Sequence, residues 1–316
     1  MFARAPFSEF AREVRQGLTR TDQKTLPCRF LYDSVGSALF DAITYLPEYG
    51  LTRADIRILQ SHARDLVQLL PGNVIVAELG SGSGSKTRPV LESLNERQVV
   101  VYYPIDVSPT ALTRCQQELG PLGVVVPLEC SYLDGLRTVA DRRAPGQTLL
   151  VLFLGSTIGN FESEAAIDFL LAVRLCLQPG DALLLGTDLV KPTEVLIDAY
   201  DDPTGVNAAF NLNILARINR ELDADFDLRQ FEHVIRYHEE AQRIEMHLRS
   251  LSYQIVSIKH ADLIVDLVPN ETICTEACHK FRPEQICTMA KMTGFRLESQ
   301  WVDQEWPFAE SLLVAV

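Results

Sequence analysis

The chain has 316 residues, of which 47% are hydrophobic and 22% are charged, and this composition predicts a globular protein with a sizeable core. Its formal net charge of −13 argues against a nucleic-acid or anionic-membrane partner. The apolar stretches are too short to span a bilayer, and the N-terminal residues lack the apolar segment of a signal peptide.

The cysteines and histidines argue against two further kinds of site. The chain has 7 cysteines, an odd number, and no C-x-x-C pair, so we expect reduced thiols in a cytoplasmic protein. Its 6 histidines form no H-E-x-x-H pattern, and no metal site is therefore expected. Nothing in the composition indicates an oligomer, and a monomer is our starting expectation.

In chain order, residues 1–54 are polar and predicted to be mostly helical. An apolar strand at residues 74–77 then leads into a glycine-rich turn at residues 78–87, which a helix follows. In such an arrangement the backbone N–H groups can approach a ligand closely.

The glycine-rich turn is compatible with several ligands. Ser85 stands where a P-loop requires glycine, and the charge of Glu78 would oppose a triphosphate. A dinucleotide-binding turn needs its third glycine at the same position 85. The glycines at 80, 82 and 84 instead match the E-x-G-x-G-x-G turn of class I methyltransferases, whose ligand S-adenosylmethionine carries a sulfonium rather than phosphates. A turn that binds no ligand is the remaining alternative.

Asp106 favours a nucleoside ligand. It ends a second predicted strand at residues 99–105, about two dozen residues after the turn, where a carboxylate can accept both ribose hydroxyls of an adenosine. Ser108 is the expected N-cap of a helix over residues 109–118. The alternative role for Asp106 is that of a helix-capping acid.

The alternation of strands and helices then continues and predicts an α/β fold with a doubly wound, mostly parallel sheet. Further on, residues 191–227 are predicted to be helical, and residues 243–268 alternate as strands. We therefore expect a sheet domain at 55–190 and 281–316, and an inserted mixed α+β domain at 1–54 and 191–280. The later elements are strands at 124–128, 147–154, 182–186 and 311–316, and helices at 162–177 and 283–293, the last ended by Gly294.

The segment just after the fourth strand is the next candidate for ligand binding, because ligands of such sheets bind outside the carboxyl ends of the strands. Gly155 and Gly159 allow close approach of the backbone. Asn160 offers two donors and an acceptor, which suit the carboxylate or amine of a zwitterion. An ordinary turn or N-cap asparagine is the alternative.

Several segments together resemble the histidine-specific Nα-methyltransferase family of the ergothioneine pathway. The similarity covers almost the whole chain and rests on residues 30–40, 46–53, 78–82, 154–160, 186–191, 199–202 and 219–226. The resemblance implies the class I methyltransferase fold, S-adenosylmethionine as cofactor, and L-histidine as the substrate that is methylated three times on its α-nitrogen to give hercynine.

The resemblance also implies roles for individual residues. Tyr49, Asn160 and Tyr200 match residues that hold the substrate carboxylate, and Tyr32 and Phe40 match aromatic residues near the amino group. We take Tyr32, Asn160 and Tyr200 as the catalytic set. Glu276 matches the acid that binds the imidazole. The remaining matched positions are Gly155, Met246 and Cys278 for the substrate, and Glu78, Gly80, Gly82, Lys86, Asp106, Ser131 and Tyr132 for the cofactor.

Two positions depart from the family pattern. Cys278 stands where the family has serine, and a thiol is a weaker hydrogen-bond donor, so histidine affinity or substrate preference is expected to differ. Ser131, followed by Tyr132, stands where the family usually has an acid beside the adenine. Neither change removes a group that the methyl transfer itself needs.

Overall fold

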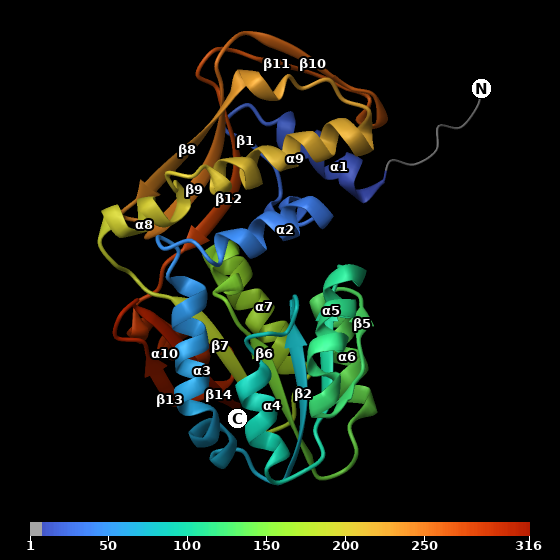
Figure 1. Cartoon of the computed structure of the whole chain (residues 1–316), viewed down its shortest axis with the longest axis vertical. Coiled ribbons are helices and arrows are strands. Elements are labelled where there is room, and N and C mark those ends of the chain that lie inside the picture. Colours follow the sequence, from blue (N-terminus) through green and yellow to red (C-terminus); the bar gives the residue numbers. More distant parts are fainter. Residues whose placement is uncertain (1–7) are drawn as a thin grey trace, which may run out of the picture. The chain divides into compact units, whose positions relative to one another are not determined.

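The computed structural model describes residues 8–316, so the first seven residues of the predicted N-terminal segment lie outside the described part (Figure 1). The chain divides into two compact units. We call Gly50–Val190 with His279–Val316 the sheet unit, and the rest, up to Tyr49 and from Lys191 to Cys278, the inserted unit. The boundary falls at residue 50 rather than 55 because helix α3 (Leu51–Gln68) packs on α4 and β14 of the sheet unit.

The sheet unit contains an eight-stranded sheet with the order β13-β14-β7-β6-β2-β3-β4, and β5 also pairs with β3. All pairs among β2, β3, β4, β5, β6 and β7 are parallel, whereas β14 is antiparallel to both β7 and β13. The doubly wound, mostly parallel sheet is thus confirmed. Its strands are β2 (Asn73–Leu79), β3 (Val101–Asp106), β4 (Val124–Val125), β5 (Leu128–Glu129), β6 (Gln147–Phe153), β7 (Ala182–Asp188), β13 (Phe295–Val302) and β14 (Phe308–Ala315).

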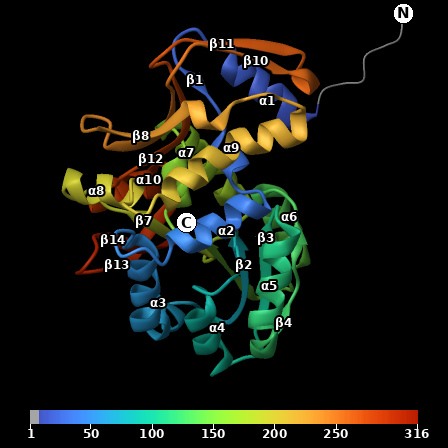
Figure 2. The ribbon, with the colours of Figure 1, turned by 45° about the horizontal axis from the view of Figure 1, so that its top comes forward.

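Helices cover both faces of this sheet, and Figures 1 and 2 show α3 and α4 side by side. One apolar core packs α3, α4 and α5 on one face, and a second packs α6, α7 and α10 on the other. The central strands are buried on both faces, which explains their continuous apolar sequence. The helices are α4 (Arg88–Asn95), α5 (Pro109–Leu119), α6 (Tyr132–Arg142), α7 (Ser163–Leu175) and α10 (Pro283–Met292), with a 3-10 turn η3 (Thr157–Asn160).

Local signals in the sequence account for several element ends. The Ser108 side chain accepts a hydrogen bond from the Ala111 amide and caps α5, as expected. Gly294 follows α10 with φ +78°, a conformation that ends a helix. The single strand expected at 124–128 is wrong: β4 and β5 are separate, because Pro127 has no N–H for the ladder.

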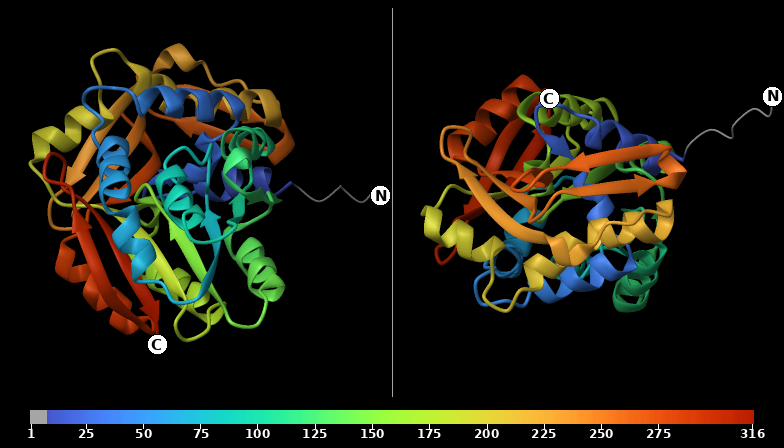
Figure 3. Two further views of the ribbon diagram at one scale, coloured as in Figure 1. Left: turned by 60° about the horizontal axis from the view of Figure 1, so that its bottom comes forward. Right: turned by 90° about the horizontal axis from the view of Figure 1, so that it is seen from above.

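The inserted unit is built around a four-stranded sheet with the order β1-β12-β9-β8. Helix α9 (Val206–Leu222) packs on β8 and β9 and also on α2 (Ser34–Ile43). A separate antiparallel hairpin of β10 and β11 is visible on the right of Figure 3. The other elements are α1 (Glu9–Leu18), β1 (Lys24–Thr25), η1 (Cys28–Leu31), α8 (Thr193–Tyr200), β8 (Phe231–His238), β9 (Arg243–Ser250), β10 (Gln254–Ile258), β11 (Leu263–Leu267) and β12 (Thr272–His279).

The helices expected between 191 and 227 and the strands expected between 243 and 268 are confirmed by α8, α9, β9, β10 and β11. Strands β1, β8, β12 and β13 were missed. In the described part of the chain, no helix combines the length and the apolar character needed to cross a membrane.

Candidate functional site

The glycine-rich turn lies at the carboxyl end of β2, in the sheet unit. Gly80, Gly82 and Gly84 have φ angles of +73°, +53° and +72°, which side-chain-bearing residues adopt only with strain. The Gly82 amide donates to Asp106 Oδ2 at 3.0 Å, and a Cβ atom on Gly82 would meet nothing within 4 Å. The turn therefore keeps open space beside its backbone, as close approach to a ligand requires.

Asp106 ends the neighbouring strand β3, as predicted. Its second oxygen, Oδ1, accepts from the Ser108 amide at 2.9 Å, so two backbone amides fix the carboxylate. Each carboxylate oxygen has two lone pairs, and the side chain is only partly buried. Asp106 can therefore accept hydroxyl donors from a nucleoside in addition to these amides.

Glu78 points into the protein and ties the two ends of the turn together. Its Oε2 accepts from the Thr87 hydroxyl at 2.6 Å and from the Tyr102 hydroxyl. Burial raises the pKa of Glu78 to about 7, although both hydroxyls act in the opposite direction. The structure gives Glu78 a role in holding the turn, and its direct contact with a cofactor stays a prediction.

Lys86 and Gly155 meet at the carboxyl edge of the same sheet. Lys86 Nζ and the Gly155 amide both donate to Asp55 Oδ2, at 2.9 and 3.1 Å. Gly155 has φ +70°, and a Cβ there would lie 2.7 Å from Lys86 Nζ. Burial alone would lower the pKa of Lys86, but Asp55 and the other nearby carboxyl groups together outweigh it and the pKa is raised, so the residue stays a cation.

Tyr132 and Ser131 follow β5. A Cβ on Gly80 would lie 3.1 Å from the Tyr132 hydroxyl oxygen, which places this ring beside the turn. Ser131 is exposed, caps α6, and donates to Asp134 Oδ2 at 2.6 Å. Tyr132 is thus placed with the turn, whereas a cofactor contact of Ser131 stays a prediction.

Asn160 ends η3 in the loop after β6. This loop has two consecutive left-handed residues, Gly155 and Ser156, the latter with φ 60°. Left-handed backbone is unfavourable for serine, and the Asp188 amide compensates by donating to Ser156 Oγ at 2.9 Å. The loop is therefore held in one conformation, which fixes the position of Asn160 within the sheet unit.

Four aromatic residues that the sequence singled out lie together in the inserted unit. The ring of Tyr200 is 6.4 Å from that of Tyr49, and Tyr49 is 6.3 Å from Phe40. Tyr32 is 5.4 Å from Phe40, and both contact Phe210 of α9. Phe210 was missed, because an apolar residue in an amphipathic helix carries no signal beyond core packing.

A buried polar network supports this aromatic cluster. His233 Nε2 lies 2.8 Å from the Tyr200 carbonyl oxygen, and Nδ1 lies 2.8 Å from Asn211 Nδ2. Asn211 also donates to the His247 carbonyl at 3.1 Å and accepts from the Thr275 hydroxyl at 2.5 Å. Because Asn211 Nδ2 can only donate, His233 carries its proton on Nε2, and burial lowers its pKa. The network links Tyr200 to β12.

Glu276 and Cys278 lie on β12, and Met246 lies on the adjacent strand β9. All three side chains are buried. The Thr275 hydroxyl is also 3.0 Å from the Met246 carbonyl, so the two strands are joined at this level. The roles of these three residues toward an imidazole stay predictions.

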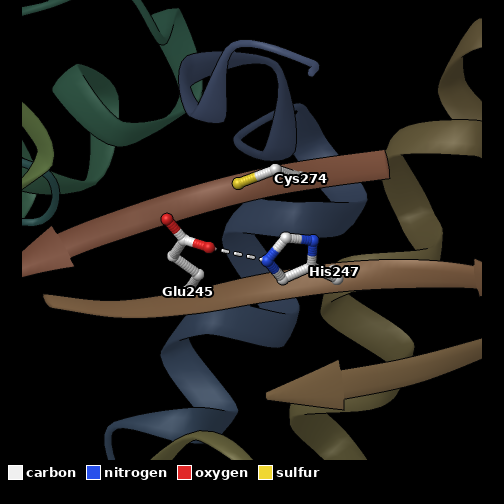
Figure 4. A group of neighbouring side chains, drawn as sticks. All are labelled: Glu245, His247 and Cys274. Atoms are coloured by element: carbon white, nitrogen blue, oxygen red, sulfur yellow. Dashed lines mark hydrogen bonds and ion pairs between the residues drawn. The ribbon is translucent and has the colours of Figure 1, made fainter. Parts of the chain in front are cut away.

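The same two strands carry a group of possible metal-ligating side chains, Glu245, His247 and Cys274 (Figure 4). No pattern in the sequence indicated this group. One ligand-type atom from each lies within 4.8 Å of the others. Glu245 Oε2 already bonds His247 Nε2 at 2.8 Å and His238 Nε2 at 3.1 Å, and its other oxygen pairs with Arg243. Burial and Glu245 raise the pKa of Cys274 to about 12. The thiol of Cys274 is neutral, and Arg243 balances the charge of the Glu245 carboxylate. These two features favour hydrogen-bonded packing over metal ligation.

Comparison with known proteins agrees with these features. The family model described as histidine-specific, SAM-dependent methyltransferase matches residues 10–315. A protein named histidine N-alpha-methyltransferase from Mycolicibacterium smegmatis is 42% identical over 310 residues, covering 96% of this chain and 94% of that protein.

Two further relatives extend this comparison. A protein of the same name from Mycobacterium tuberculosis is 42% identical over 306 residues, with coverages of 95% and 93%. Ergothioneine biosynthesis protein 1 from Neurospora crassa is 34% identical over 202 residues, which are 62% of this chain and 23% of that protein. The chain has the glycine-rich turn and a carboxylate that can accept ribose hydroxyls, and the family model matches nearly its whole length. The chain therefore belongs to the histidine-specific, S-adenosylmethionine-dependent methyltransferases.

Proposed function

We propose that the chain transfers methyl groups from S-adenosylmethionine to the α-amino group of L-histidine and forms hercynine for ergothioneine biosynthesis. The near full-length similarity to proteins named histidine N-alpha-methyltransferase carries this proposal. The buried acid Glu276 supports it, because a carboxylate can accept a charge-assisted hydrogen bond from an imidazole N–H worth about 1.5–3 kcal/mol.

The residues of the sheet unit fit the cofactor. Gly82 leaves open space beside the backbone of the turn, Asp106 is available for the ribose hydroxyls, and Lys86 offers a cation for the carboxylate of the amino-acid part. S-adenosylmethionine supplies an electrophilic methyl group on a positively charged sulfur. We propose Gly80, Gly82, Lys86, Asp106 and Tyr132 as contacts, with Glu78 and Ser131 as further candidates.

The substrate side of the proposal uses neutral donors. Tyr49, Asn160 and Tyr200 would hold the histidine carboxylate through hydroxyl and amide groups, so that they place no cation beside the amine. The amine must lose its proton before it can attack the methyl carbon. We propose that Tyr32 and Phe40 border the amino group. Gly155, Met246, Glu276 and Cys278 complete the proposed substrate set.

The protein is proposed to act in the cytoplasm as a monomer, without a nucleic-acid partner. The net charge of −13 opposes binding to phosphate backbones. No described cysteine forms a disulfide, which is compatible with a reducing compartment.

Two alternatives are separated by one experiment. A family member acting on a histidine derivative or an indole amino acid would release S-adenosylhomocysteine with that substrate, whereas a non-catalytic regulator would release none. The protein is given S-adenosylmethionine and each of the twenty amino acids and several histidine derivatives, and S-adenosylhomocysteine is quantified. We expect L-histidine to give the highest rate, since indole has one N–H and no basic nitrogen for Glu276. A higher rate with another amino acid would overturn the substrate assignment.

A further inference from the structure

Two buried carboxyl groups lie next to Lys86, which follows the glycines of the turn. Asp55 of α3 and Glu310 of β14 are both 0% exposed. Glu310 is the cross-strand partner of Gly186 on β7, and a Cβ at Gly186 would lie 2.6 Å from Glu310 Oε1. The missing side chain at 186 therefore makes the space that the Glu310 carboxyl fills, within a strand that is otherwise largely apolar.

Among the described residues, no N–H or O–H group donates to either oxygen of Glu310 or to Asp55 Oδ1. A buried polar group without a partner costs about 1–3 kcal/mol, so three such atoms in one place require an explanation. The two carboxyl groups are within hydrogen-bonding reach of each other. A single proton between them gives Asp55 Oδ1 and one Glu310 oxygen a hydrogen bond, in the way that paired carboxyls share one proton elsewhere.

The electrostatics of the site agree with a shared proton. Burial and the neighbouring Asp55 both raise the pKa of Glu310 well above its usual range, and Lys86 opposes them only in part. If Glu310 were ionised, Lys86 would stand among the negative charges of Asp55, Glu310 and Glu78. The carboxylate of an amino-acid ligand would then meet a site with excess negative charge.

The remaining oxygen of Asp55 connects the pair to the ligand site. Asp55 Oδ2 accepts from Lys86 Nζ at 2.9 Å and from the Gly155 amide at 3.1 Å. These two donors come from the segments that follow β2 and β6, at the edge of the sheet where ligands of this fold bind. Asp55 thus holds one group from each segment with a single oxygen.

We propose that Asp55 and Glu310 share one proton and act as a positioning pair, which fixes Lys86 and the Gly155 amide for the amino-acid end of S-adenosylmethionine. The proposal rests on the cofactor assignment made above. Neither carboxyl touches the reacting atoms. Glu310 acts through Asp55, and Asp55 acts through Lys86 and Gly155.

The test compares two replacements of Glu310 by calorimetric titration with S-adenosylhomocysteine. In Glu310→Gln an amide N–H can donate to Asp55 Oδ1 in place of the shared proton, so we expect affinity within about twofold of the unaltered protein. In Glu310→Leu the volume is similar but no donor remains, and binding should weaken about tenfold, as loss of one buried hydrogen bond to a charged group implies. Glu298→Gln, an exposed acid on the adjacent strand β13, is the matched control.

A second step distinguishes an effect on binding that acts through Lys86 from a general disturbance of the structure. The Glu310→Leu replacement is repeated in a Lys86→Met background, where its effect on binding should shrink to about twofold, because the pair acts through Lys86. Circular dichroism and thermal unfolding show which variants fold. If Glu310→Leu does not fold, Glu310→Met replaces it, since methionine likewise offers Asp55 Oδ1 no donor.

The outcomes are distinct. Equal affinities of folded Glu310→Leu and Glu310→Gln would overturn the positioning pair, as would a full tenfold loss that persists in the Lys86→Met background. Failure of the unaltered protein to bind S-adenosylhomocysteine would instead contradict the cofactor assignment itself.

Discussion

Replacing Glu78 by Gln is expected to make the protein more stable at neutral pH but not at acidic pH. The Glu78 carboxyl is buried beneath the glycine turn, and the Thr87 and Tyr102 hydroxyls both donate to the same oxygen, Oε2. The amide oxygen of glutamine can accept both bonds. The substitution therefore keeps the hydrogen bonds and removes only the charge.

The magnitude follows from the pKa of Glu78, which burial raises from 4.5 to about 7. At pH below 4.5 the carboxyl is protonated in the folded and the unfolded protein, and its neutral form is buried without a charge penalty. As the pH rises from below 4.5 to above 7, the unfolded chain ionises first, and the stability of the folded state falls by ~3 kcal/mol in total. Most of this change, ~2.5 kcal/mol, lies between pH 5 and pH 8.

The assay is urea unfolding of both proteins at pH 5 and pH 8, with S-adenosylmethionine absent. The free energy of unfolding of Glu78→Gln minus that of the unaltered protein should increase by ~2.5 kcal/mol between the two pH values. Glu298→Gln, which changes an exposed acid, should show no such increase. A difference for Glu78→Gln that is the same at both pH values would refute the reasoning, because Glu78 would then be ionised throughout or not buried.

Three further substitutions test the proposed substrate residues. Asn211→Ala removes the hydrogen bonds to His233, to the His247 carbonyl and to Thr275. We therefore expect the free energy of unfolding to fall by about 2–3 kcal/mol and the affinity for L-histidine to fall as well. If both values were unchanged, the network would not support Tyr200. Asn160→Ala should weaken L-histidine binding in calorimetry far more than S-adenosylhomocysteine binding, and equal losses would count against a role at the substrate carboxylate. Cys278→Ser should tighten L-histidine binding, since a hydroxyl is the stronger donor; an unchanged dissociation constant would place residue 278 away from the imidazole.

Much of the sheet unit could be predicted from the sequence because its signals are local. Apolar runs, the Ser108 cap and the glycine spacing after Glu78 each depend on a few neighbouring residues, and each appears in the structure close to its expected place. Strand β13 was missed because charged residues alternate with apolar ones at the edge of the sheet, which gives a weaker pattern than a strand buried on both faces.

The supporting residues of the site could not be predicted in this way. Asp55 and Glu310 are far apart in the chain, and only the packing of α3 on β14 brings them together. One signal was present: Glu310 is an acid within an apolar strand, a pattern that indicates a buried polar group with a partner. The links from His233 through Asn211 to Thr275 likewise join β8, α9 and β12, and no local pattern indicates them.

Mass spectrometry of the methylated product tests whether the protein methylates the α-nitrogen of L-histidine. The protein is incubated with L-histidine and S-adenosylmethionine that carries isotope-labelled methyl groups, and the product is fragmented to locate the label. We expect a histidine with three labelled methyl groups, all on the α-nitrogen and none on the imidazole. A label on the ring, or no labelled histidine from protein that binds S-adenosylhomocysteine, would contradict this expectation.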